Sequence, residues 1–340
     1  MIVDDSAIAR SVLSRMLAKH DEFEIVASAA TAAEAVAMLK GEAVDIILLD
    51  LEMPGGSGLE ALPEIRRHGN GARILVVSST TEQGSQSAVQ ALALGAADTL
   101  AKPGVGMGAG LFSERLVDRL RRLLPADWDA DAIETPPLVE AADPPGRIAC
   151  LAIGASTGGL HAISLFLSAL PARLDVPLLI TQHLPPPFLP LFARQIEIGS
   201  ARPARVAEQG MVVGPGEILI APGDAHLGLQ RVRGKVRVRL SREPQPCGCM
   251  PAVDAMLTAL AKTYGAQGIG IVLSGMGRDG LEGSRLLAAA GGTILVQDRA
   301  SSAVWGMPGS ISDAGLARLA ASPQALAGTI GNWIEAAGCR

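Results

Sequence analysis

The sequence has few aromatic residues, few cysteines and no excess of positive charge. Phe, Trp and Tyr make up 3% of its 340 residues, so aliphatic side chains and alanine have to fill the core. The four cysteines, at positions 150, 247, 249 and 339, form no paired framework, which favours a reducing cytoplasm. Cys247 and Cys249 have the spacing of half a metal site, but no second pair and no histidine near them in the sequence completes it. The net charge of -5 gives no electrostatic reason to expect a nucleic acid or an anionic membrane as partner.

Signals for membrane targeting are absent as well. No apolar run reaches the length of a membrane span, and the first ten residues carry two acids and no apolar core, unlike a signal peptide. Hydrophobic residues make up 49% and charged residues 19% of the chain, which is typical of globular proteins, and the length suits two domains. We therefore predict a soluble, cytoplasmic, two-domain protein without membrane insertion.

Two stretches of alternating strand-like and helix-like segments predict two α/β domains. The first covers residues 1–124, where buried strands such as EIVASA (24–29) and DIILLD (45–50) alternate with amphipathic helices. Residues 125–146 are acidic and proline-rich, and their apolar residues follow neither the helical nor the strand periodicity, which predicts a linker. The alternation restarts in residues 147–340, so we expect two doubly wound folds whose parallel sheets are covered on both faces. Two strand-like runs within residues 218–240 resemble a hairpin, which predicts a mixed rather than purely parallel second sheet.

Three carboxylates are predicted to meet at one edge of the first sheet. Asp4 and Asp5 follow the first short strand, and Asp50 ends the strand IILLD. The carboxyl ends of strands in a doubly wound sheet converge on one crevice, where these charges would repel one another. A hard cation with oxygen ligands, Mg²⁺, removes that repulsion. Ser78 and Lys102 also fall at strand ends on the same edge, so the set indicates a binding site rather than unrelated capping acids.

The first domain resembles a response-regulator receiver domain, which implies a flavodoxin-like fold. The resemblance rests on the two adjacent aspartates and on the segments DLEMPGGSGLEAL (50–62), VSS (77–79) and AKP (101–103). It departs from the pattern in two places. The chain starts three residues before Asp4, so we expect a short first strand, and Thr99 stands where such domains often carry an aromatic switch residue.

The receiver resemblance implies a phosphorylation site with its usual supporting residues. Asp50 would accept a phosphoryl group from a histidine kinase, and Asp4, Asp5 and Asp50 would hold Mg²⁺. Lys102 would pair with the phosphoryl oxygens, and Ser78 would sense them. The added negative charge would then reorganise that surface.

Ser156 lies in a glycine-rich turn, GASTG (154–158), directly after the apolar run IACLAI (148–153). The pattern G-x-S-x-G is typical of a nucleophile on a tight turn from strand to helix, whose following helix offers free N–H groups to an oxyanion. Two other interpretations fit the same residues: a helix N-cap serine and a phosphate-binding loop.

A serine nucleophile needs a base, and the chain has five histidines. His20 and His68 belong to the first domain, His161 lies on the face of the next helix, and His226 lies in a turn as a rim or substrate contact. His183 ends the strand PLLITQH, and it emerges at the same sheet edge as the serine if the two strands are neighbours. We therefore predict that His183 is the base.

The third member of the predicted triad is Asp279. It lies in IGIVLSGMGRDG (269–280), which again reads as strand, glycine turn and helix, and the dipole of that helix would favour its charge. The chain order Ser, His, Asp differs from the Ser, Asp, His order of α/β-hydrolases, which indicates a separate hydrolase lineage.

A dinucleotide-binding dehydrogenase is a rival interpretation of the same segment. GMGRDG (275–280) is a literal G-x-G-x-x-G between a strand and a helix, and Asp298 lies near where a ribose-binding acid would be. However, Asp279 would then place a carboxylate where a pyrophosphate should bind. This interpretation also leaves the GASTG turn and His183 without a role.

The second domain resembles the catalytic domain of the chemotaxis protein-glutamate methylesterases, and the order receiver, linker, esterase matches that family. The resemblance rests on the segments IGASTGG (153–159), TQHLPP (181–186), IAPGDAHL (220–227), PAVDAML (251–257), SGMGRDG (274–280) and WGMPGS (305–310). One segment departs, because CGCM (247–250) stands where relatives often carry a His-Arg pair.

This second resemblance implies the activity and the roles of five residues. The enzyme would hydrolyse γ-glutamyl methyl esters on the cytoplasmic helices of methylated chemoreceptors, release methanol, and deamidate selected receptor glutamines. Ser156 would be the nucleophile, His183 the general base and Asp279 the orienting carboxylate, while Thr157 and Met276 would contact the oxyanion or the substrate. No cofactor is expected for this step, and phosphorylation of the receiver would regulate it. A non-catalytic binding module with a vestigial triad is the other class considered.

Overall fold

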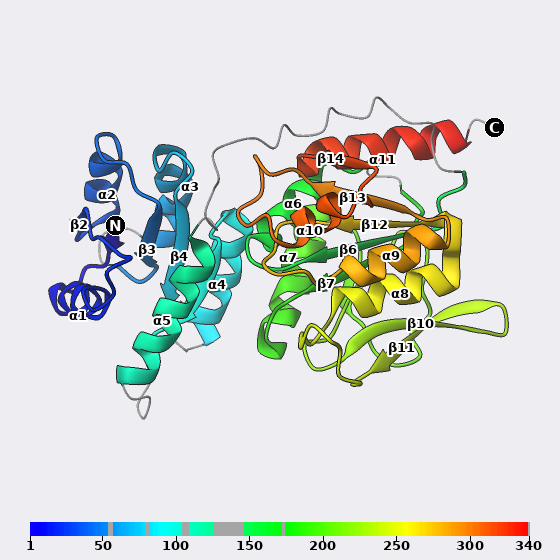
Figure 1. The fold of residues 1–340 in the computed structure, drawn as a ribbon, viewed down its shortest axis with the longest axis horizontal. Helices are drawn as coiled ribbons and strands as arrows, with labels where there is room; N and C mark the ends of the chain where they lie inside the picture. The colour runs from blue at the N-terminus through cyan, green and yellow to red at the C-terminus, as the bar shows by residue number, and fades with distance from the viewer. Residues whose placement is uncertain (54–56, 79–81, 104–108, 125–145, 172–173, 339–340) are drawn as a thin grey trace. The chain divides into compact units, whose positions relative to one another are not determined.

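A computed structural model of the chain describes residues 1–53, 57–78, 82–103, 109–124, 146–171 and 174–338. It divides into two compact units, Met1–Trp128 and Asp129–Arg340, and each is an α/β fold (Figure 1). The predicted linker, residues 125–146, lies almost wholly outside the described residues, so its boundaries stay a prediction. Among the described helices, none combines the length and the apolar character needed to cross a membrane.

The first unit contains a five-stranded parallel sheet in the order β2-β1-β3-β4-β5. Its elements are β1 (Ile2–Val3), α1 (Ala7–Leu17), β2 (Ser28–Ala29), α2 (Ala32–Leu39), β3 (Ile46–Asp50), α3 (Gly58–His68), β4 (Arg73–Ser78), α4 (Glu82–Leu94), β5 (Asp98–Ala101) and α5 (Ala109–Leu123). This strand order is that of the flavodoxin-like folds, in which ligands bind where the order reverses, between β1 and β3. The prediction of a flavodoxin-like first domain is therefore confirmed.

One predicted strand of this unit is much shorter than expected. The run EIVASA (24–29) was expected to be a buried strand, but only Ser28 and Ala29 are paired, and most of the run is at least partly exposed. Their partners are Ile2 and Val3, the two residues of β1. β1 is the single neighbour of the edge strand β2 and begins at Ile2, so the residues before Ser28 have no partner for a ladder.

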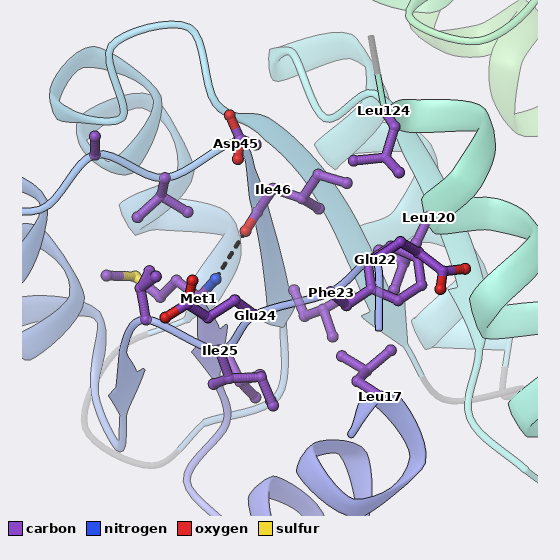
Figure 2. Close-up of a pocket in the computed structure, with 15 residues that line it drawn as sticks. Met1, Leu17, Glu22, Phe23, Glu24, Ile25, Asp45, Ile46, Leu120 and Leu124 are labelled. Atoms are coloured by element: carbon purple, nitrogen blue, oxygen red, sulfur yellow. Dashed lines mark hydrogen bonds between the residues drawn. The ribbon is translucent and has the colours of Figure 1, made fainter. Parts of the chain in front are cut away.

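A pocket of about 310 Å³ lies in the first unit at the amino ends of β1 and β3 (Figure 2). The Met1 amino group donates a hydrogen bond to the Ile46 carbonyl oxygen at 2.9 Å. Burial lowers the pKa of this amine to about 6, and the charge of Asp45 opposes the shift. The pocket lies at the edge opposite to the carboxyl ends of the strands, where this class of sheet binds its ligands.

The second unit contains a seven-stranded parallel sheet in the order β14-β13-β12-β6-β7-β9-β8. Its strands are β6 (Cys150–Ala155), β7 (Leu178–Gln182), β8 (Ala204–Val206), β9 (Ile218–Ile220), β12 (Gly268–Val272), β13 (Thr293–Gln297) and β14 (Leu319–Ala321). Its helices are α6 (Gly159–Ala169), η1 (Pro186–Phe188), α7 (Leu189–Ser200), α8 (Val253–Tyr264), η2 (Gly265–Gln267), α9 (Leu281–Ala289), α10 (Met307–Asp313) and α11 (Pro323–Gly338). Helices α6 and α11 pack together, and α8 packs against α9 across the sheet from them (Figure 1).

The predicted hairpin exists, but the expectation of a mixed sheet is wrong. Strands β10 (His226–Val232) and β11 (Lys235–Ser241) form a separate two-stranded antiparallel sheet, which no strand of the main sheet joins. The hairpin packs on α8, and its buried Leu227 and Val238 belong to the same core cluster as Met256 of that helix. A helix therefore separates the hairpin from the main sheet, whose strand pairs are all parallel.

The strand order of the second unit reverses at β6, which puts three chain segments at one edge. From β6 the chain continues to β7 on one side, whereas β12 on the other side leads on to β13. Right-handed crossovers in opposite directions place α6 and α9 on opposite faces of the sheet. The loops that follow β6, β7 and β12 therefore open into the same crevice at the carboxyl edge.

Candidate functional site

Ser156, His183 and Asp279 meet at this crevice. Ser156 directly follows β6, His183 directly follows β7, and Asp279 lies in the turn between β12 and α9. His183 Nδ1 lies 3.1 Å from Ser156 Oγ, and His183 Nε2 lies 2.9 Å from Asp279 Oδ2. The imidazole thus bridges a hydroxyl and a carboxylate that are more than 100 residues apart in the chain.

The orientation of the imidazole assigns its protons. Asp279 is a carboxylate acceptor, so Nε2 carries the hydrogen and donates to it. The lone pair of Nδ1 then faces the serine hydroxyl, which donates to it. In the chymotrypsin arrangement the two ring nitrogens have the opposite partners. Either nitrogen serves as a base, provided that the carboxylate fixes the tautomer on the other side.

Asp279 is hydrogen-bonded to the start of a second helix, α8. Besides His183, its oxygens accept from the backbone N–H groups of Val253 at 2.7 Å and Asp254 at 3.0 Å, the first two residues of α8. Burial raises the pKa of this carboxyl, but the hydrogen bonds from His183, Val253 and Asp254 outweigh it and hold the pKa below the usual range. The dipole of α8 thus favours its charge in addition to that of the following helix, α9, whose N-cap Gly280 comes directly after Asp279.

The turn around Ser156 is held by two polar side chains that the sequence analysis did not single out. The buried Gln182 donates from Nε2 to the Ser156 carbonyl oxygen at 2.8 Å, and the Ser156 N–H donates to the Ser274 carbonyl at 3.0 Å. Ser274 Oγ donates to the Thr157 carbonyl at 2.8 Å and accepts from the Val304 N–H at 3.0 Å. Both residues belong to strand-end motifs quoted above, but only tertiary contacts reveal that they position the serine.

Close packing also requires glycine in this region. Gly158 has φ +73°, a left-handed conformation that favours glycine, and it precedes α6. Gly275 has a negative φ, yet a Cβ built on it would collide with Met307 Sδ and would lie 3.0 Å from Ser156 Cβ and 3.1 Å from Ser156 N. The turn after β12 therefore packs so closely against Ser156 that a side chain at position 275 has no room.

Replacing Gly275 by alanine is expected to displace Met307 and, with it, Ser156. We expect a loss of about 1–3 kcal/mol in the free energy of unfolding, as for other overpacked sites, and a larger fall in kcat than rise in KM. Denaturant unfolding and steady-state kinetics measure the two effects. Gly199→Ala is the matched control, since nothing lies within 4 Å of a Cβ at that helical position. A Gly275→Ala variant with the wild-type rate would contradict this packing argument.

Thr157 and Met276 flank the triad from the two turns. Within the described part of the chain, neither backbone N–H donates a hydrogen bond to another protein group, so both are available to a ligand. The Met276 side chain is 44% exposed and lines a pocket that also contains Asp279. Their roles as oxyanion or substrate contacts stay predictions.

Two side chains considered in the sequence analysis have structural roles instead. His226, interpreted as a rim or substrate contact, is buried, and its two ring nitrogens bond to the Glu243 carbonyl and the Ala252 N–H, both at 2.9 Å. Asp298, the acid of the dehydrogenase interpretation, accepts from the N–H and hydroxyl of Ser301 at 2.8 and 2.6 Å. These hydrogen bonds are all made within the protein, so they give neither residue a contact with substrate.

The predicted acidic cluster forms at the carboxyl edge of the first sheet. Asp4, Asp5 and Asp50 place carboxylate oxygens within 4.8 Å of one another. Lys102 Nζ lies 2.7 Å from Asp50 Oδ2 and 3.9 Å from Asp4 Oδ2. The buried Ser78 ends β4 beside them, and its carbonyl accepts from the Lys102 N–H at 2.7 Å. All five residues are thus brought together, although their roles stay predictions.

The donor set of this cluster fits a hard divalent cation. Burial is the main influence on Asp50 and raises its pKa, the hydrogen bond from Lys102 opposes the shift, and the charge of Asp4 adds to it. A nearby dication would favour the ionised form of Asp50 and so oppose the effects of burial and of the Asp4 charge. Asp4 and Asp50 are buried, whereas Asp5 is exposed to solvent. The cluster therefore offers Mg²⁺ the mixture of protein oxygens and water that it prefers.

Comparisons with known proteins match both units. The family model described as CheB methylesterase matches residues 151–330, and that of the response regulator receiver domain matches residues 1–106. A protein-glutamate methylesterase/protein-glutamine glutaminase of Caulobacter vibrioides is 39% identical over 327 residues, 93% of each chain. One from a Nocardioides species is 36% identical, over 93% of this chain and 90% of its own.

A solved structure matches the second unit. The crystal structure of the Thermotoga maritima CheB methylesterase catalytic domain superposes with a TM-score of 0.53 and 34% identity. The match covers 56% of this chain and 98% of that one. Both resemblances found in the sequence are thereby confirmed, and the dehydrogenase interpretation has no support. This chain belongs to the CheB methylesterase family, with a response regulator receiver domain preceding its methylesterase domain.

Proposed function

We propose that this protein is a serine hydrolase that cleaves γ-glutamyl methyl esters on the cytoplasmic helices of chemoreceptors and releases methanol. The relatives named above are protein-glutamate methylesterases and protein-glutamine glutaminases, which supports the substrate class. The observation that carries the proposal is the relay of two hydrogen bonds, 3.1 Å from Ser156 to His183 and 2.9 Å from His183 to Asp279.

The first half of the reaction forms a glutamyl-enzyme. Ser156 Oγ attacks the ester carbonyl carbon while its proton passes to His183 Nδ1. The ionised Asp279 stabilises the resulting imidazolium through Nε2–H. The N–H groups of Thr157 and Met276 are our candidates for binding the oxyanion, where one donor is typically worth about 10²–10³-fold in rate. His183 then returns the proton to the departing methoxide, and methanol leaves.

The second half regenerates the enzyme. His183 takes a proton from water, which attacks the acyl carbonyl, and Ser156 leaves with that proton restored. A glutamine side chain would follow the same route with ammonia as the leaving group, which accounts for a paired glutaminase activity. The residues of the relay supply the acid, the base and the nucleophile for both substrates.

Methanol release from methylated receptor membranes tests this proposal directly, with ammonia release from glutamine-bearing receptors as the second assay. The rival class, a binding module with a vestigial triad, predicts binding to the receptor without release of either product. Saturable binding of a nicotinamide cofactor would instead revive the dehydrogenase interpretation.

The receiver unit is proposed to regulate this activity through Asp50. Mg²⁺ held by Asp4, Asp5 and Asp50 would neutralise negative charge on an incoming phosphoryl group. Lys102, now 2.7 Å from Asp50, would transfer its ion pair to the phosphoryl oxygens, and the Ser78 hydroxyl would respond to them. A histidine kinase is the proposed phosphodonor.

Phosphorylation of Asp50 is expected to raise the methylesterase rate about 5-fold or more, the lower end of typical coupling between two sites. The full-length protein is assayed with Mg²⁺, with and without a small-molecule phosphodonor such as acetyl phosphate. Asp50→Asn keeps the shape of the side chain but has no carboxylate to phosphorylate, so it should not respond. An equal response in wild type and Asp50→Asn would rule out Asp50 as the regulatory site.

A further inference from the structure

The two cysteines of the loop between β11 and α8 lie beside the relay. Cys249 Sγ, a ring nitrogen of His183 and a carboxylate oxygen of Asp279 all lie within 4.8 Å of one another. Cys247 Sγ lies equally close to oxygens of Asp279 and Asp254. In the sequence no histidine near this pair completed a metal site. The fold supplies one from β7, together with a carboxylate from the turn after β12.

We propose that Cys247, Cys249, His183 and Asp279 form an inhibitory binding site for a thiophilic divalent cation of the zinc class. The site goes beyond the proposed function, and only its inhibitory effect rests on that function. The binding itself rests on two overlapping groups of ligand atoms that share Asp279, one with Cys249 and His183 and the other with Cys247 and Asp254.

The ligand set selects the metal. Two thiolates, one imidazole and one carboxylate are donors that Zn²⁺ takes in a tetrahedron, whereas Mg²⁺ and Ca²⁺ take oxygen. Tetrahedral Zn²⁺ with bonds of about 2.0–2.3 Å would bring its ligand atoms to roughly 3.5 Å from one another. Cys249 Sγ therefore has to move about 1 Å closer to His183 and Asp279 from the 4.8 Å limit, and Cys247 Sγ has to move from Asp254 toward His183, within a loop that is largely exposed.

The loop already directs both sulfurs toward the site. Gly248 has φ +68°, and this turn lets the Cys249 N–H approach Cys247 Sγ at 3.4 Å. Cys247 is exposed and both Cys249 and His183 are half-buried, so an ion has a path from solvent. Asp279 is buried and anchored by the start of α8, so it provides the fixed point of the cluster.

The thiols are kept protonated until a cation arrives. Burial raises the pKa of Cys249 to about 12, and the charge of Asp279 adds to the shift. Burial likewise raises the pKa of Cys247. A bound dication offsets both effects, and the two thiol protons leave to solvent as the thiolates coordinate.

Metal binding would inactivate the base by reversing its tautomer. His183 Nε2 faces Asp279, so it is the nitrogen that would coordinate the ion. A neutral imidazole bound through Nε2 carries its hydrogen on Nδ1, which faces Ser156 Oγ. That nitrogen then has no lone pair to accept the serine proton, and the nucleophile is not activated.

Inhibition is tested on the full-length protein in excess Mg²⁺ with added Zn²⁺ alone. We expect Zn²⁺ to lower the rate of methanol release at least about tenfold, and a chelator to restore it. The double variant Cys247→Ser plus Cys249→Ser, compared with its own zinc-free rate, should need at least about tenfold more Zn²⁺. Asp5→Asn in the receiver cluster is the control and should remain as sensitive as wild type. Equal sensitivity of the double cysteine variant would overturn the site.

A spectroscopic measurement separates this inference from the proposed function. Co²⁺ bound to the full-length protein should show thiolate-to-cobalt charge-transfer absorption, which Ser156→Ala retains and the double cysteine variant loses. The same result is expected even if the protein had no methylesterase activity. A wild-type spectrum without thiolate absorption would overturn the metal site regardless of the kinetics.

Discussion

Replacing Ser156 by alanine is expected to lower kcat for methanol release at least about 10⁴-fold, because the covalent route through the serine is lost. The substitution removes one oxygen that makes one hydrogen bond, 3.1 Å to His183, at a half-buried position. We therefore expect little change in stability, about 1 kcal/mol or less. Steady-state kinetics on methylated receptor and a thermal melt measure the two quantities.

Ser164→Ala is the matched control for this experiment. Ser164 lies on α6, two turns beyond Ser156, and its hydroxyl donates to the Leu160 carbonyl of its own helix at 2.9 Å. Its loss should leave the rate close to that of wild type. If Ser156→Ala kept a tenth of the wild-type rate or more, the nucleophilic mechanism would be wrong and the relay would have another purpose.

Replacing Asp279 by asparagine is expected to lower kcat by about 10⁴-fold, the size of effect that a neutral amide has at this position in another serine hydrolase. The Asp254 N–H donates to Asp279 Oδ1, whereas the Val253 N–H donates to Oδ2, the oxygen that also faces His183. An amide oxygen at the Oδ1 position keeps the contact with Asp254 and gives up the contact with Val253. The amide NH₂ would then face His183 Nε2 and donate to it. This forces the hydrogen onto Nδ1, and His183 can no longer accept the proton of Ser156.

Asp298→Asn is the control for this variant, since it makes the same chemical change at another strand end of the same sheet. Asp298 is bonded to Ser301 and not to the relay. A rate loss in Asp298→Asn similar to that in Asp279→Asn would indicate a general effect of charge on the fold. Retention of activity by Asp279→Asn would remove the carboxylate from the mechanism.

The Asp279 variant should also change the dependence of stability on acid. The pKa of Asp279 is below the value of 3.8 in the folded state, so its ionised form stabilises the fold above about pH 4 and this contribution is lost as the pH falls through the folded value. Asp279→Asn cannot titrate. The drop in its unfolding free energy between pH 5 and pH 3 should therefore be smaller than in wild type.

Much of both sites could be predicted because their residues stand at the ends of strands. Asp50 ends β3, Ser156 follows β6 and His183 follows β7, and each strand is a continuous buried aliphatic run that is visible in the sequence. The carboxyl ends of parallel strands share one edge, so the position along the chain was enough to group these side chains.

Other features could not be predicted because they depend on contacts between distant segments. The residues that hold Ser156 in place, Gln182 and Ser274, are polar residues at strand ends with no distinguishing pattern. The same is true of the helix that stabilises Asp279, since the partners Val253 and Asp279 are 26 positions apart. The mixed sheet was a wrong expectation for a similar reason: alternation identifies a hairpin, but not the surface on which it packs.

The sequence by itself determined which groups this protein brings to its chemistry and which strands carry them, because local periodicity defines the strands and the strands define their common edge. Only the tertiary structure decided which nitrogen of His183 faces Ser156, that the start of α8 donates hydrogen bonds to Asp279, and that Cys247 and Cys249 border the same relay. Those choices depend on hydrogen bonds and close packing between segments far apart in the chain, and no local pattern of residues encodes them.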